Sequence, residues 1–207
     1  MHKFLHFHFG IFLHFYVSIY SNELIKQKSE EYKKEYSLID KALFDLFESM
    51  NQNTSLEEIL IKVTALNSLY STNINGYKNL EMISKIIYES RNMDELIDAG
   101  DKEAVNIIGQ TREGMNNAFV FASKYCSFHN PNKFLIFDSY SWHALRTICG
   151  ELGIDHKLKS NPTMDFDAYN KYCKCVDNII NEFGLIHDYK KIDEFLWMKG
   201  KTLVMNQ

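Results

Sequence analysis

Apolar side chains recur at steps of three and four residues along most of the chain, the spacing of a helix with one buried face. The longest such run predicts a charged helix over Glu23–Met50. Further runs predict helices over Leu56–Leu69, Tyr77–Ser90, Met93–Ala99, Lys102–Ile108, Ala118–Phe128, Ser139–Cys149, Met164–Phe183 and Lys190–Lys199. No strand-like run is longer than Phe134–Phe137, so we expect an all-α protein of about nine helices.

Short polar and glycine-containing segments predict where these helices begin and end. Thr54 and Glu57 fit a capping box, with a hydroxyl three positions ahead of a glutamate before an apolar run. Asp101 is expected to cap the helix that follows it, and Gly100 and Gly200 are expected to follow the ends of theirs. No low-complexity linker is present, so residues 23–207 are predicted to form a single all-α domain.

Residues 1–22 form a separate segment that is mostly apolar and aromatic over Phe4–Tyr20. Its length is at the short limit for a membrane span, and polar groups interrupt it. A signal segment, a membrane anchor, a disordered tail, an additional helix on the core and an over-extended start all remain open. His6 and His8 have no carboxylate nearby, so no metal site is predicted there.

Composition narrows the classes of protein further. Fifteen Phe and twelve Tyr accompany only two Pro and nine Gly, too little turn punctuation for an all-β fold. The formal net charge of −4 counts against a dedicated non-specific DNA binder, although the half after Ala118 is less acidic. The four cysteines match no metal-binding spacing, so we expect no metal, no cofactor and a reduced, cytoplasmic setting.

The best candidate for a chemical group is Asp138, in the stretch Asn130–Arg146. Four apolar residues deliver this acid to the start of a predicted helix. Asp138 can cap that helix through its side chain. A carboxylate at such a place can also stabilise positive charge or orient water, and the two roles are compatible.

Three segments, in the right order, resemble the helix-hairpin-helix superfamily of DNA glycosylases, the endonuclease III and 8-oxoguanine glycosylase kind. Ser71-Thr72-Asn73 ends a helix as the turn that the family presses into DNA does. Gly114-Met115-Asn116-Asn117 resembles the family's hairpin, with Asn116 in place of its second glycine. Phe137-Asp138-Ser139-Tyr140-Ser141-Trp142-His143 is similar to the segment that carries the catalytic aspartate, and Phe195–Lys201 is similar to the closing helix.

The resemblance covers Leu56–Lys201 and implies a two-lobed helical bundle with Asp138 as the catalytic group. It implies DNA contacts from Asn73, Asn75, Gly114, Asn116, Asn117 and Lys199, and a base pocket lined by Trp142, His143 and Phe121. From the residues alone, Asn73 also reads as a polar helix end, Phe121 as core, and His143 as a surface or core histidine. Lys199 also suits the dipole at a helix C-terminus.

Ala118 stands where bifunctional members of the superfamily carry a lysine nucleophile. Lys124 lies six residues further on, about 240° around the same helix, and is therefore expected to point away. The resemblance then implies a monofunctional glycosylase that hydrolyses the N-glycosidic bond of a modified or damaged base.

The expected partner is double-stranded DNA that contains such a base, acted on by a monomer without a membrane. One alternative is a catalytically inactive DNA-binding, defence or regulatory protein on the same fold. Another is a helical interaction module with no nucleic-acid role.

Overall fold

The computed structural model describes residues 20–110 and 118–205, and within them the chain is all-helical, as predicted. The nine described helices are α2 (Asn22–Ser49), α3 (Leu56–Leu69), α4 (Tyr77–Glu89), α5 (Met93–Ala99), α6 (Glu103–Gly109), α7 (Ala118–His129), α8 (Ser139–Leu152), α9 (Phe166–Phe183) and α10 (Tyr189–Met205). None of them is long and apolar enough to cross a membrane.

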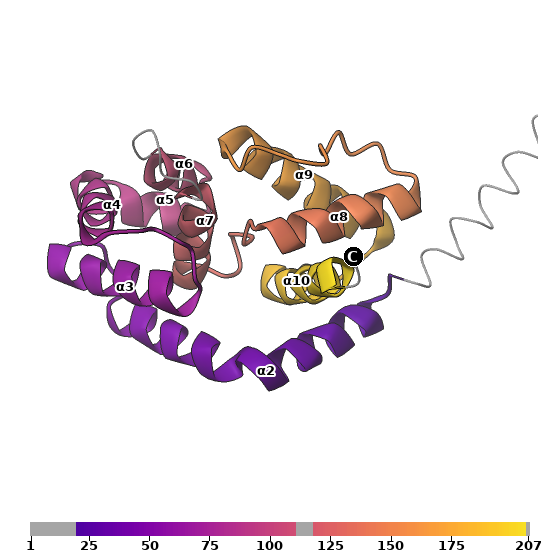
Figure 1. Ribbon diagram of the computed structural model, residues 1–207, viewed down its shortest axis with the longest axis horizontal. Helices are drawn as coiled ribbons and strands as arrows, with labels where there is room; N and C mark the ends of the chain where they lie inside the picture. Colours follow the sequence, from indigo (N-terminus) through magenta and orange to yellow (C-terminus); the bar gives the residue numbers. More distant parts are fainter. Residues whose placement is uncertain (1–19, 111–117, 206–207) are drawn as a thin grey trace, which may run out of the picture.

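The helices form two groups that α2 joins (Figure 1). Helices α3 to α7 pack together on one side, where α3 contacts α4 and α6 contacts α7. Helices α8 to α10 form the second group, in which α10 packs closely on α8. The 28-residue α2 runs along both, contacting α10 at one end of its course and α3 and α7 at the other. Ser21 caps its first turn by accepting a hydrogen bond from Leu24 N at 3.2 Å.

The chain crosses from the first group to the second through Phe134–Phe137, which connects α7 to α8 in extended form. All four side chains are buried, and the Phe137 ring packs against Trp142, Tyr169 and Tyr172. The backbone N–H of Phe137 also donates to Ser123 Oγ on α7 at 3.0 Å. This short segment therefore fixes the start of α8 relative to α7.

Three of the capping or stop residues predicted from the sequence differ from those in the structure. The N-cap of α3 is Ser55, one residue after Thr54, and its hydroxyl accepts from Glu58 N at 3.3 Å. Asp101 accepts from Glu103 N at 2.9 Å, although the N-cap position of α6 is Lys102. Helix α10 does not end before Gly200 but continues to Met205, because this glycine allows a close helix contact rather than a stop.

Candidate functional site

A cavity of about 490 Å³ lies between the two helix groups. Its walls come from α2, the turn after α3, α7, the start of α8 and α10, and a single residue, Met164, joins them from the loop before α9. The lining residues are Tyr32, Tyr36, Ile39, Asp40, Leu69, Tyr70, Ser71, Thr72, Asn73, Val120, Lys124, Asp138, Ser139, Tyr140, Met164 and Trp197. Two sequence candidates, Asp138 and Asn73, therefore share one cavity.

Asp138 is the N-cap of α8, as its sequence context predicts. One carboxylate oxygen, Oδ1, accepts from Ser141 N at 2.9 Å, which leaves Oδ2 on the cavity side free of the cap. The residue is buried, with 8% of its surface exposed. Capping and chemistry can thus use different oxygens of the same carboxylate.

Lys124 faces Asp138, and the prediction that it points away is wrong. Its Nζ lies 4.0 Å from Asp138 Oδ2, both side chains are buried, and both line the cavity. The cavity face of α7 carries Val120 and Lys124, one turn apart, whereas Ala118 does not line the cavity. The prediction assumes that Ala118 is on the side of α7 that faces Asp138. The hydrogen bond between Ser123 and Phe137 instead fixes the side of α7 that carries Lys124 toward Asp138.

The turn Ser71–Asn73 forms part of the cavity wall and has a tightly defined backbone. Ser71 and Asn73 have left-handed φ values of 47° and 60°, which asparagine tolerates better than most residues. Asn67 holds the turn from inside, accepting from Thr72 Oγ1 at 2.6 Å and from Ile74 N at 3.0 Å. Thr72 and Ile74 are buried, so Ser71 and Asn73 are the exposed residues of the turn.

Aromatic side chains line the opposite wall. The Trp197 ring on α10 contacts Tyr36, Tyr140 and Tyr32, with centroid distances of 4.9, 5.6 and 5.7 Å. Lys201 lies beside this wall, 5.2 Å from the centroids of both Tyr36 and Trp197, and its Nζ donates to Tyr36 OH at 2.7 Å. The cavity therefore combines stacking surfaces with one buried amine–carboxylate pair.

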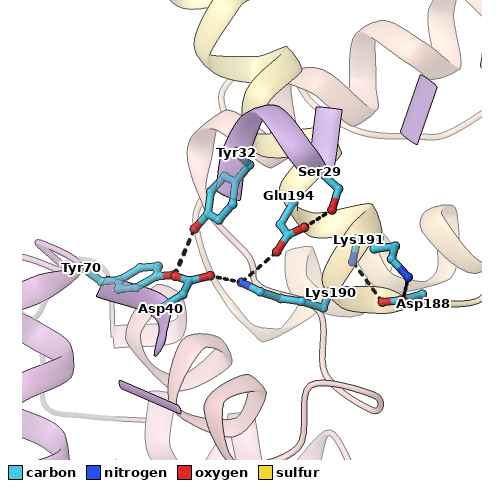
Figure 2. A network of polar contacts seen from close by, with 8 residues as sticks. All are labelled: Ser29, Tyr32, Asp40, Tyr70, Asp188, Lys190, Lys191 and Glu194. Carbon is cyan, nitrogen blue, oxygen red and sulfur yellow. Dashed lines mark hydrogen bonds and ion pairs between the residues drawn. The ribbon is translucent and has the colours of Figure 1, made fainter. Parts of the chain in front are cut away.

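A polar network at the base of this wall ties α2 to α10 (Figure 2). Asp40 accepts from Lys190 Nζ at 2.7 Å and from the hydroxyls of Tyr32 and Tyr70, while Lys190 also lies 3.8 Å from Glu194. Burial opposes the charged form of Lys190, but Asp40, Asp193 and Glu194 outweigh it and raise its pKa. The Tyr70 ring in turn lies 5.1 Å from Lys124 Nζ, so the network holds in place an aromatic ring that contacts the amine of Lys124.

The predicted base-pocket residues lie elsewhere. Phe121 is fully buried in the core against Tyr125, which agrees with its alternative interpretation as a core residue. Trp142 is buried and its indole donates to Lys159 O at 3.0 Å, away from the cavity lining. His143 is half-buried on α8 and is also absent from the lining. Instead, the lining includes Tyr32 and Tyr36 on α2, Tyr140 on α8 and Trp197 on α10. The four-residue spacing of Tyr32 and Tyr36 is the signal that the sequence offers for this wall.

Lys199 and Asn75, two further predicted DNA contacts, do not line the cavity. Lys199 donates to Tyr20 OH at 2.7 Å and lies 3.7 Å from Glu151, so its charge is already paired. Asn75 is exposed beyond the turn, and its carbonyl accepts from Asn79 Nδ2 at 2.6 Å. The hairpin residues Gly114, Asn116 and Asn117 lie outside the described residues.

The side chains of Lys124 and Asp138 can take part in chemistry directly. A buried lysine can act as a nucleophile once deprotonated, and a nearby carboxylate can stabilise a developing cation or accept a proton. Among the residues that the structure describes, no group of three or more His, Cys, Asp or Glu side chains is placed to hold a metal ion.

Comparisons with known proteins place the chain in a family without naming an activity. The family model described as HI_0787_N: N-terminal domain matches residues 19–133, more than half of the chain. An uncharacterized protein of Haemophilus influenzae (strain ATCC 51907 / DSM 11121 / KW20 / Rd) is 30% identical over 153 residues, covering 73% of this chain and 70% of that protein. No solved structure matches the chain. On the family model and this relative together, the chain belongs to the HI_0787_N family.

Proposed function

We propose that this protein is a DNA N-glycosylase that releases a modified or damaged base from duplex DNA, on a fold of the two-lobed helix-hairpin-helix glycosylase type. The observation that carries the proposal is the pair Lys124 and Asp138, 4.0 Å apart in a cavity between two helix groups. The turn Ser71–Asn73 borders the same cavity and is the candidate wedge that fills the gap left by an extruded base.

The pair supports the following chemistry. Breaking an N-glycosidic bond builds positive charge on the sugar, which the Asp138 carboxylate can stabilise. The neutral Lys124 amine attacks C1′ as the bond to the base breaks, and the departing base takes up a proton. After the amine loses its proton and the sugar ring opens, the product is a Schiff base between Lys124 and C1′. The aromatic wall around Trp197 offers surfaces on which the extruded base can stack.

The position of Lys124 changes the reaction product that is expected. The monofunctional expectation depended on the missing lysine at Ala118, and the geometry favours an amine supplied from Lys124 instead. A Schiff base is trapped by borohydride as a stable protein–DNA adduct, whereas hydrolysis by water leaves none. We therefore expect trapping with the wild type and its loss in Lys124→Gln.

The test is base release on a panel of modified duplexes by the wild type and three variants. Asp138→Asn and Lys124→Gln should each lower the rate by roughly 10²–10⁴-fold while circular dichroism shows a folded chain. Lys174→Gln, an exposed lysine on α9, is the matched control and should keep wild-type activity. Release by Asp138→Asn at the wild-type rate would remove the proposed role of this acid.

A DNA-binding protein without catalysis is the second candidate. It is favoured by Ala118, which stands where bifunctional members of the superfamily carry the lysine nucleophile. Salt-dependent duplex binding without base release on any duplex of the panel would support it. An absence of duplex binding at low salt would contradict both candidates.

A further inference from the structure

Three buried polar atoms behind Asp138 have no hydrogen-bond partner within the described part of the chain. They are Ser141 Oγ on α8, Tyr172 OH on α9 and Asp193 Oδ1 on α10. Ser141 also donates its backbone N–H to Asp138, which places this cluster against the proposed catalytic acid. Buried polar atoms without partners are costly and usually mark a bound water or a special protonation state.

The position of Asp193 on its helix directs it at the start of α8. Asp193, Trp197 and Gly200 are spaced by four and three residues and so share one face of α10. On that face, Trp197 contacts the Tyr140 ring at 5.6 Å, and Gly200 packs directly on the Tyr140 backbone. Asp193 is 5% exposed, so its carboxyl lies inside the junction of α8, α9 and α10.

Several charged and titratable groups face Asp193 from the surrounding helices. These are Lys190 and Glu194 on α10, Lys124 on α7, Asp138 before α8, Tyr172 on α9 and Tyr32 on α2. Burial is the largest influence and raises the pKa of Asp193 well above its usual range, with Asp138 and Glu194 adding to it and Lys190 and Lys124 opposing it. Burial also raises the pKa of the Tyr172 phenol, and the charges of Asp193 and Asp138 raise it further.

The contacts of the two acids distinguish them. Asp138 accepts a backbone N–H at the N-terminus of α8 and faces the amine of Lys124, so its described partners are donors. Asp193 has an oxygen without a partner in a buried place, which favours the neutral acid. A second carboxylate in the same buried cluster also disfavours the charged form of Asp193.

We infer that Asp193 is a positioning residue that carries a proton in the working protein, beside Ser141 and Tyr172, so that Lys124 faces Asp138 without a second negative charge. The protonation state concerns the chain itself, whereas its consequence for catalysis rests on the proposed function.

The consequence follows from the amine chemistry. Lys124 must lose a proton before it can attack the sugar. An ionised Asp193 would add a negative charge near Lys124 and oppose that loss. A neutral Asp193 leaves Asp138 to stabilise the sugar cation. Asp193→Asn imitates the neutral acid in shape and charge, so it should preserve the working state.

The first test reads the proton directly. Between about pH 5 and pH 7, where an ordinary Asp is ionised, the wild type should show the infrared carbonyl stretch of a protonated carboxylic acid. The spectrum of the wild type minus that of Asp193→Asn should contain this band, and the spectrum of the wild type minus that of the control Asp188→Asn, whose acid pairs with Lys191 at the start of α10, should lack it. A wild type without the band overturns the inference, whatever its activity.

The second test uses stability and activity. A raised carboxyl pKa means that the folded state holds the proton that the unfolded state has lost, so stability falls as pH rises above about 4. Asp193→Asn should lack this fall. Relative to the wild type, its base release should gain at high pH, where an ionised Asp193 would hold the proton on Lys124, and identical pH profiles of the two proteins would overturn the positioning role. If the wild type releases no base from any duplex, the proposed function fails, while the infrared band still decides the protonation state.

Discussion

Two buried lysines of the first helix group meet different partners. Lys124 faces the carboxylate of Asp138 beside the cavity. Lys62 donates instead to the carbonyl oxygens of Met50 and Gln52 and to Asn53, at 2.8, 3.2 and 3.0 Å. Burial lowers the pKa of Lys62 to about 8. Lys62 thus satisfies backbone groups at the end of α2, a structural role, and leaves the chemistry to Lys124.

His129, next to Lys62, is predicted to make the fold sensitive to acid. Burial, and then the charge of Lys62, lower its pKa to about 3, while an unfolded His titrates near 6.5. Between these values the unfolded chain binds the extra proton, so stability falls as pH falls. From about pH 6.5 to pH 5 the loss should be about 2 kcal/mol in urea unfolding.

His129→Asn should remove most of this pH dependence, and His187→Asn, at an exposed position, should keep it. An unchanged slope in His129→Asn would assign the acid sensitivity to other groups.

The structural positions of single residues can be predicted from the sequence to different extents. Asp138 was predictable as a cap because its neighbours in the chain define the helix start. The place of Lys124 was not, since it depends on the contact between Ser123 and Phe137, fourteen positions apart. The tyrosines of the cavity wall cannot be recognised from the sequence as such, because stacking surfaces and core surfaces have the same helical spacing.

At the scale of elements, the tightest joint is the crossing of α10 over the start of α8. A Cβ on Gly200 would lie 2.1 Å from the Tyr140 carbonyl oxygen, a distance that forces the helices apart. The joint therefore positions Ser139–Ser141, the first turn of α8, which Asp138 caps, as well as the Trp197 wall.

Gly200→Ala is predicted to destabilise the protein by about 1–3 kcal/mol and to weaken the site, because α10 must shift. Gly150→Ala is a matched control on α8, where the added methyl meets nothing within 4 Å. It should be neutral or stabilise by up to about 1 kcal/mol. Thermal unfolding of both variants measures the difference, and equal effects would mean that the α8–α10 joint is loose.

Helix positions were largely readable from the sequence, and their ends less so. The periodicity gives the predicted helices to within a few residues at most ends, since burial of one face sets it. The end of α10 was predicted six residues early, at Lys199 rather than Met205. A glycine that ends a helix and one that permits close packing cannot be told apart without the neighbouring helix.

At the scale of the whole molecule, α2 joins both helix groups through buried charge (Figure 2). Asp40 and Lys190 form an ion pair at 2.7 Å with little exposure, and the Tyr70 hydroxyl from the first group completes it. The sequence predicts α2 only as a charged helix, because nothing local distinguishes a solvated acid from one that α10 will cover.

Lys190→Met should cost about 3–5 kcal/mol in urea unfolding, because it leaves Asp40 buried without its cation. The neighbouring Lys191 offers a control, since it pairs with Asp188 at 2.7 Å on a more exposed surface (Figure 2). Lys191→Met should cost at most about 1 kcal/mol. Similar costs for the two variants would show that the buried pair does not join the groups.

The packing of α2 on α10 also sets an order of events during synthesis. The first half of α2 rests on α10 through Ser29 with Glu194 and Tyr32 against Trp197, and Tyr20, just before α2, packs against Phe195. A ribosome makes α2 long before α10, so the nascent chain carries this half of the helix uncovered throughout translation of the intervening segments. The aromatic wall closes only when α10 arrives, and until then the growing chain has the amine of Lys124 but no finished pocket in which to use it.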